Sequence, residues 1–205
     1  MFRLSVSNLT KRFGARKVFT EISFDLRTGD SIAVIGPNGS GKTTLLMTLL
    51  ACLRPTGGEI AYYQEDSRLD DDRVRCCTSL VAPYLNLYDN LTAEENLKFF
   101  ATVAGASITG KRVDALLAKV GLEGRGMDMV KEYSSGMIQR LKYAVALLNE
   151  PAFLFLDEPT ANLDEDGKQI VFDIIEECRG TSILVIATNE REEYDLASNL
   201  CRVGS

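Results

Sequence analysis

The residues Gly36-Pro37-Asn38-Gly39-Ser40-Gly41-Lys42-Thr43 form the most informative motif of this chain. It follows the apolar run 31–35 and opens the apolar run 45–50, so the predicted order is strand, glycine-rich loop, helix. The spacing G-x-x-x-x-G-K-T is that of a phosphate-binding loop. Glycines let the backbone approach phosphate oxygens, and the N–H groups of a helix N-terminus attract them. We expect these residues, together with Thr44, to bind the phosphates of a nucleotide.

Lys42 and Thr43 carry the chemistry of this loop. The ammonium group of Lys42 can neutralise charge on the outer phosphates, and the hydroxyl of Thr43 can bind Mg²⁺. The sequence therefore predicts a site for a nucleotide and its magnesium ion at the start of the helix.

Two carboxylates, Asp157 and Glu158, follow the apolar run 153–156. Such a run is typical of a buried parallel strand, and ligands bind at the carboxyl ends of such strands. We expect Asp157 to hold Mg²⁺ through water beside Thr43, and Glu158 to polarise a water that attacks the γ-phosphate. Taken alone, the stretch is equally compatible with a strand that ends in two solvated acids.

Composition excludes several classes of protein. With 205 residues, 45% of them hydrophobic, the chain is long enough for one α/β domain. The net charge of −6 argues against a nucleic-acid partner. Five cysteines without C-x-x-C spacing favour reduced thiols over a metal site, and the chain has no histidine. Without a signal peptide or a membrane-spanning run, the expected location is the cytoplasm, with membrane association only through a partner.

The remaining elements follow from periodicity and end signals. Alternating residues at 2–9 and 22–26 predict two half-buried antiparallel strands joined by a basic turn at 11–14. Thr92 with Glu95 forms a capping box, which predicts the start of a helix. The other predicted elements are the helix from Lys42 to about Arg54, a strand at 59–63, a polar acidic loop at 65–72, an irregular stretch at 80–90, helices from Thr109 to Gly121 and from Ser134, a helix at 164–179, a strand at 182–187, a helix at 190–198 and a short strand around Cys201.

A third motif, Tyr133-Ser134-Ser135-Gly136, lies shortly before the acidic strand, and 161–164 (Ala-Asn-Leu-Asp) follows that strand. With these motifs the chain resembles the ATP-binding-cassette ATPases over essentially its whole length. The resemblance implies that Ser134, Ser135 and Gly136 head a helix that reaches the nucleotide of a second subunit. It also implies that Phe13 stacks on adenine, although a core position for this ring stays open.

The resemblance implies an α/β fold of the P-loop NTPase type. This is a RecA-like mixed sheet core with an N-terminal antiparallel part and an inserted all-helical subdomain. We expect one domain over 1–205, with the nucleotide-binding core at 1–84 and 151–205 and the helical subdomain at about 85–150.

The chain departs from the family pattern at three places. Asn189 takes the position of a histidine that contacts the γ-phosphate, and no glutamine occurs near Pro83, where the family has one that helps to bind Mg²⁺. The third motif carries Ser135 and Met137 in place of the usual glycine and glutamine. An amide can donate a hydrogen bond but cannot carry charge. We therefore expect slow ATP hydrolysis with Glu158, Asn189 and Lys42 as the catalytic residues; binding of ATP without much turnover is the competing hypothesis.

The implied cofactors are ATP and Mg²⁺, and the implied partners are a second ATPase chain in a homodimer and an integral-membrane permease. The aromatic stretch 84–88 either receives the permease or packs the helical subdomain. The resemblance favours an exporter. Two alternatives stay open: a non-transport ATPase of the same family, and a nucleotide-gated binding module with little hydrolysis.

Overall fold

Two β-sheets of different kind form the frame of the protein, whose computed structural model describes residues 1–204. The first sheet has antiparallel strands in the order β2 (Arg16–Arg27), β1 (Phe2–Phe13), β4 (Gly57–Gln64) and β5 (Ser67–Arg68). The second has parallel strands in the order β6 (Thr78–Val81), β7 (Phe153–Asp157), β8 (Ile183–Thr188), β3 (Ser31–Ile35) and β9 (Asn199–Arg202).

The helices begin where polar side chains cap them. Thr92, Thr109 and Ser134 accept hydrogen bonds from backbone N–H groups three residues on, which confirms the three predicted helix starts. Thr92 and Glu95 form the predicted capping box. The helices are α1 (Lys42–Leu49), α2 (Asp71–Cys77), α3 (Ala93–Val103), α4 (Gly110–Lys119), the 3₁₀ turn η1 (Val130–Glu132), α5 (Ser135–Ala146), α6 (Glu165–Arg179) and α7 (Arg191–Tyr194).

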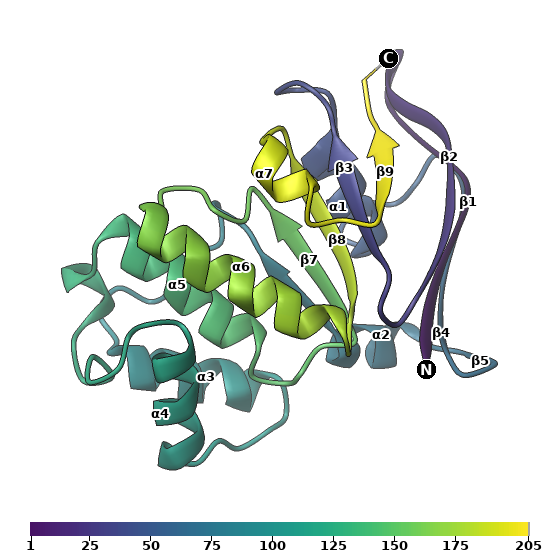
Figure 1. Ribbon diagram of the computed structural model, residues 1–205. Coiled ribbons are helices and arrows are strands. Elements are labelled where there is room, and N and C mark those ends of the chain that lie inside the picture. Colours follow the sequence, from purple (N-terminus) through teal and green to yellow (C-terminus); the bar gives the residue numbers. More distant parts are fainter. Residues whose placement is uncertain (205) are drawn as a thin grey trace.

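Figure 1 shows α3 to α6 on one side of the parallel strands and the β1–β2 hairpin on the other. The strand β7 belongs to both of the hydrophobic cores that result. Phe153 and Phe155 pack with the antiparallel sheet and α1, whereas Leu154 and Leu156 pack with the helices. This follows from the alternation of side chains along a strand that is buried on both faces.

Several predicted boundaries are wrong. The basic turn expected at 11–14 is strand up to Phe13, and the chain reverses at Gly14, whose φ of 57° suits glycine. The acidic loop expected at 65–72 contains β5 and the start of α2, and the irregular stretch begins only after β6. The final helix is the short α7 rather than 190–198, and α1 ends at Leu49 rather than near Arg54.

The carboxyl ends of the parallel strands bring distant segments together. The glycine-rich loop follows β3, Glu158 follows β7 and Asn189 follows β8, and β8 lies between the other two strands. The edge of the sheet thus gathers the predicted loop and acids at one place. Among residues 1–204, no helix has the length and apolar character that crossing a membrane requires.

Candidate nucleotide site

The glycine-rich loop needs glycine for steric reasons at two positions. A Cβ atom on Gly36 would lie 2.3 Å from the carbonyl oxygen of Val203. A Cβ on Gly41, whose φ is 108°, would lie 2.3 Å from Cγ1 of Val18. Since neither contact is sterically possible, the close approach of the loop to Val203, directly after β9, and to Val18 of β2 excludes side chains at both positions.

Lys42 is held inside the loop. It is 6% exposed, and its Nζ donates to the carbonyl oxygens of Gly36 at 2.8 Å and of Pro37 at 3.3 Å. A cavity of about 320 Å³ adjoins it, which also receives Glu158 from the end of β7. The other residues that line this cavity are Phe13, Arg16, Val18, Asn38, Gly39, Gly41, Thr43 and Thr44.

Phe13 forms an exposed wall of this cavity. Its side chain is 52% exposed, and Nζ of Lys11 lies 4.7 Å from the centre of its ring, a cation–π contact. Phe13 therefore lies outside both hydrophobic cores, at a position where a flat base could stack on it. Arg16, on the neighbouring strand, lines the same cavity. The predicted strand 22–26 does not reach this residue, because β2 is longer and begins at Arg16.

The metal position predicted from the sequence has its two residues in contact. Oγ1 of Thr43 donates to Oδ2 of Asp157 at 2.7 Å. A hydroxyl and a carboxylate are oxygen ligands of the kind that Mg²⁺ takes, so the pair fits this ion. Asp157 is 2% exposed, and burial raises the pKa of its carboxyl, while hydrogen bonds from Thr43 and Tyr84 and the charge of Lys42 act in the opposite direction.

Tyr84 is a residue of the site that the sequence did not indicate. Its hydroxyl donates to Oδ2 of Asp157 at 3.3 Å, the same oxygen that Thr43 contacts. Burial and the neighbouring carboxylate raise the pKa of this phenol well above its usual value, so it stays a hydrogen-bond donor. The sequence predicts for this tyrosine only a contact with a partner or a place in the packing of the helical subdomain.

Glu158 and Asn189 line a second cavity, of about 380 Å³, together with Asn38 of the glycine-rich loop. Both side chains are exposed. The backbone at Glu158 has a φ of 48°, and its N–H donates to the carbonyl oxygen of Ala187 at 2.9 Å, which fixes the turn after β7. The cavity is acidic; its further lining residues are Thr160, Ala161, Lys168, Thr188, Glu190, Glu192 and Glu193.

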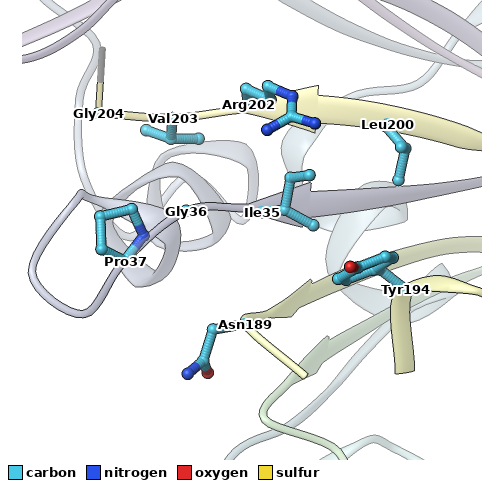
Figure 2. A pocket seen from close by; sticks show the side chains of 9 residues that line it. All are labelled: Ile35, Gly36, Pro37, Asn189, Tyr194, Leu200, Arg202, Val203 and Gly204. Atoms are coloured by element: carbon cyan, nitrogen blue, oxygen red, sulfur yellow. The ribbon is translucent and has the colours of Figure 1, made fainter. Parts of the chain in front are cut away.

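A third cavity, of about 490 Å³, lies on the β9 side of the loop. Figure 2 shows Pro37 and Asn189 at one end of it and Tyr194 and Leu200 at the other. Asn189 thus lines both the second and the third cavity, so its amide can contact groups that bind beside Pro37.

Ser134, Ser135 and Gly136 do not line the two cavities that contain Lys42 and Glu158. Both serines are exposed at the N-terminus of α5. The helix itself is tied to the acidic segment, because Nε2 of Gln139 and the hydroxyl of Tyr143 both donate to the carbonyl oxygen of Pro159, at 3.3 and 3.0 Å.

Comparison with known proteins agrees with these motifs. A family model described as ABC transporter matches residues 19–161. The uncharacterized ABC transporter ATP-binding protein YdbJ of Bacillus subtilis is 35% identical over an alignment of 202 positions that covers 96% of this chain and 65% of the relative. The Nod factor export ATP-binding protein I of Ralstonia nicotianae is 34% identical, covering 97% of this chain and 63% of the relative. This chain therefore spans slightly less than two thirds of the length of these relatives.

Solved structures share the fold. An ABC transporter ATP-binding protein from Pyrococcus furiosus superimposes with a TM-score of 0.85 at 26% identity, over 98% of this chain and 97% of that chain. A dimeric ATP-binding cassette in a post-hydrolysis state, bound to ADP and phosphate, superimposes with a TM-score of 0.83 at 24% identity, over 98% and 94%. These similarities confirm the predicted fold class.

Proposed function

Since the chain belongs to the ABC transporter family of ATP-binding proteins, as its motifs predicted, we propose that it binds and hydrolyses ATP to drive a membrane permease. The observation that carries this proposal is the 2.7 Å hydrogen bond between Thr43 and Asp157, because it joins the phosphate-binding loop to the acidic strand. Lys42 and Glu158 line one cavity beside it. This is the arrangement that phosphoryl transfer needs, since catalysis there is chiefly positioning and charge stabilisation.

In the proposed reaction, separate residues bind the phosphates, hold the metal ion and activate the water. The loop from Gly36 to Thr44 holds the phosphates, and Lys42 leaves its two carbonyl partners to neutralise charge on them. Thr43 and Asp157 hold Mg²⁺, which when bound neutralises phosphate charge. Glu158 orients and polarises the attacking water. Asn189 donates a hydrogen bond to the γ-phosphate, and because it carries no charge, hydrolysis is slow.

A second copy of the chain completes the site. This part of the proposal is supported by the exposure of Ser134 and Ser135 at a helix N-terminus whose residues line neither of the chain's own two cavities that contain Glu158. Backbone N–H groups at such a terminus attract phosphate. Two chains that meet head to tail would place each α5 terminus against the nucleotide of the other, and Ser134, Ser135 and Gly136 would bind it.

The permease docks beside α3. An aromatic cluster supports this assignment: the ring of Tyr88 lies 4.7 Å from that of Phe99, which lies 5.4 Å from that of Phe100. Tyr88 and Phe99 are exposed although both are large and apolar. Exposed aromatic side chains of this kind favour a protein interface. The chain would then lie on the cytoplasmic face of the membrane, and the relative named for Nod factor export favours an exporter.

The second candidate function is a nucleotide-gated module that binds ATP and closes with little turnover. The observation that favours it is Asn189 in a chain without histidine. The only charged side chains that line the second cavity are Lys168 and the glutamates, and none of them is an imidazole that could transfer a proton at neutral pH.

Phosphate release under single-turnover and steady-state conditions tests both candidates. We expect slow release by the wild type and a further loss of about 10²-fold or more in Glu158→Gln, since the amide cannot polarise water. Glu123→Gln, which alters an exposed acid outside the site, is the matched control. Equal release by wild type and Glu158→Gln, with ATP still bound, would favour the gated module.

A further inference from the structure

Lys142 is a buried cation in the middle of α5. It is 7% exposed, and no ion pair joins it to a carboxylate in the part of the chain that the structure describes. Its Nζ donates instead to two backbone carbonyl oxygens, of Ala82 at 3.1 Å and of Pro83 at 2.8 Å. Burying an ammonium group is costly unless its hydrogen bonds are satisfied. Lys142 therefore constrains the segment that supplies these carbonyls.

That segment is the turn that carries Tyr84. It begins directly after β6, and the N–H of Leu85 donates to the carbonyl oxygen of Ala82 at 3.2 Å, which closes the turn around Pro83 and Tyr84. Lys142 binds the same carbonyl of Ala82 and the next one along the chain. The ammonium group thus anchors the turn on the α5 side, immediately before Tyr84.

The phenol of Tyr84 points from this turn to the metal position. Its hydroxyl donates to Oδ2 of Asp157 at 3.3 Å, whereas hydroxyl donors usually approach within about 2.5–3.0 Å. A contact this long depends on the position of its backbone, so a shift of a few tenths of an ångström in the turn would make or break it. Groups that hydrogen-bond a ligating carboxylate orient it and set its affinity for the metal.

We propose that Lys142 is a positioning residue: through the carbonyls of Ala82 and Pro83 it places Tyr84 against Asp157, and so links helix α5 to the affinity of the site for Mg²⁺. The inference rests on the proposed function, in which Asp157 holds that ion. It connects α5, whose N-terminus is exposed, to the metal position through two hydrogen-bonded steps, from Lys142 to the turn and from Tyr84 to Asp157, which the covalent chain at 82–84 joins.

The competing explanation is that Lys142 only satisfies two buried carbonyls and stabilises the fold. The two explanations predict different effects of a Lys142 substitution on the magnesium dependence of ATP binding. If the role is structural, replacing Lys142 lowers the free energy of unfolding and leaves the magnesium dependence of ATP binding unchanged. A positioning role changes that dependence, and does so only while the hydroxyl of Tyr84 is present.

The test is a double-mutant cycle on the magnesium dependence of ATP binding. The affinity of the full chain for a fluorescent ATP analogue is titrated against Mg²⁺ for wild type, Lys142→Met, Tyr84→Phe and the double variant. The environment of bound Mn²⁺ is followed by electron paramagnetic resonance in each. Tyr62→Phe is the matched control, because it removes a buried phenol that donates to the carbonyl of Leu49 at 2.9 Å.

We expect Tyr84→Phe and Lys142→Met each to raise the half-saturating Mg²⁺ concentration by about tenfold, the low end for groups behind a metal ligand. The double variant should equal Tyr84→Phe alone, since Lys142 acts through that hydroxyl. Binding of the analogue in EDTA should stay within about twofold of wild type, and Tyr62→Phe should behave as wild type in every measurement.

Unchanged magnesium dependence in Lys142→Met, or effects that simply add in the double variant, would overturn the inference. Should Lys142→Met not fold, Lys142→Gln replaces it, because its amide can still donate one hydrogen bond and a partial shift is then expected. A wild type that binds the analogue without any magnesium dependence would instead overturn the proposed function, and the inference with it.

Discussion

Thr43 and Asp157 lie 114 positions apart in the sequence, and a 2.7 Å hydrogen bond joins their side chains. The first residue follows the glycine-rich loop after β3, and the second ends β7, with β8 between those two strands. This one side-chain contact therefore joins the two parts of the site, the glycine-rich loop after β3 and the acidic end of β7, across the sheet.

Replacing Thr43 by valine keeps the shape of the side chain and removes its hydroxyl. We expect the gain in ATP affinity that Mg²⁺ provides to fall by at least about tenfold, because a ligand and a partner of Asp157 are lost together. Isothermal titration with and without Mg²⁺ measures this gain. Thr43→Ser, which keeps the hydroxyl, should retain it; a similar loss in the serine variant would contradict the assignment.

Asn189→His should accelerate phosphate release by about 10-fold to 10²-fold, because imidazolium stabilises charge that an amide cannot. A histidine of ordinary pKa, about 6.5, is charged only at lower pH, so the acceleration should be larger at pH 6 than at pH 8. Steady-state rates across that range measure it. The control is Asn90→His at an exposed turn, which should leave the rate unchanged; equal acceleration there would point to a non-specific effect.

Phe153→Ala should lower the free energy of unfolding by about 3–5 kcal/mol. The ring is fully buried and makes edge contacts with Phe2 and Tyr62, at centroid distances of 5.6 and 4.8 Å, so its loss opens a cavity between the two sheets. Urea denaturation measures the change. Val103→Ala, at an exposed helix end, should change stability by less than about 0.5 kcal/mol.

Lys142→Met should alter how stability depends on pH. Burial lowers the pKa of this ammonium group in the folded chain below its unfolded value of 10.5. Between the lowered pKa and 10.5, the unfolded chain binds the proton and the folded chain does not, so wild-type stability gains with rising pH. The variant lacks this gain. Stability of Lys142→Met relative to wild type should therefore be highest near neutral pH and decrease towards pH 10.

Urea denaturation of both proteins at several pH values between 7 and 10 measures this difference. Lys119→Met serves as the comparison because that lysine pairs with Glu177 at the surface. A difference between Lys142→Met and wild type that does not vary with pH would contradict the prediction.

The sequence predicted those parts of the structure that local chemistry determines. Thr92, Thr109 and Ser134 cap helices where their side chains can accept backbone hydrogen bonds. The apolar runs 31–35 and 153–156 are the buried strands β3 and β7, since only a sheet covered on both faces suits such runs. The glycine-rich loop lies between strand and helix as its spacing required.

Elements without a strong local signal were missed. The helix α2 has the sequence Asp-Asp-Arg-Val-Arg-Cys-Cys, in which apolar residues mark no face. Its N-cap, Asp70, is the first of three consecutive aspartates, so the sequence does not mark where the helix starts. Tyr84 and Lys142 were not recognised as part of the site. A tyrosine in an irregular segment carries no mark of the direction in which it points, and a lysine on a helix is normally solvated; both positions result from tertiary packing.

Lys142 binds backbone carbonyl groups, so these hydrogen bonds do not depend on the chemical type of the side chains at positions 82 and 83. The arrangement depends instead on the side chains at 84 and 142. The phenol of Tyr84 reaches Asp157 only while Lys142 holds the turn in place, and the buried ammonium group of Lys142 is stable only while the carbonyls of that turn accept its hydrogen bonds. Across related sequences these two positions should therefore be inherited as a pair, changing together or not at all.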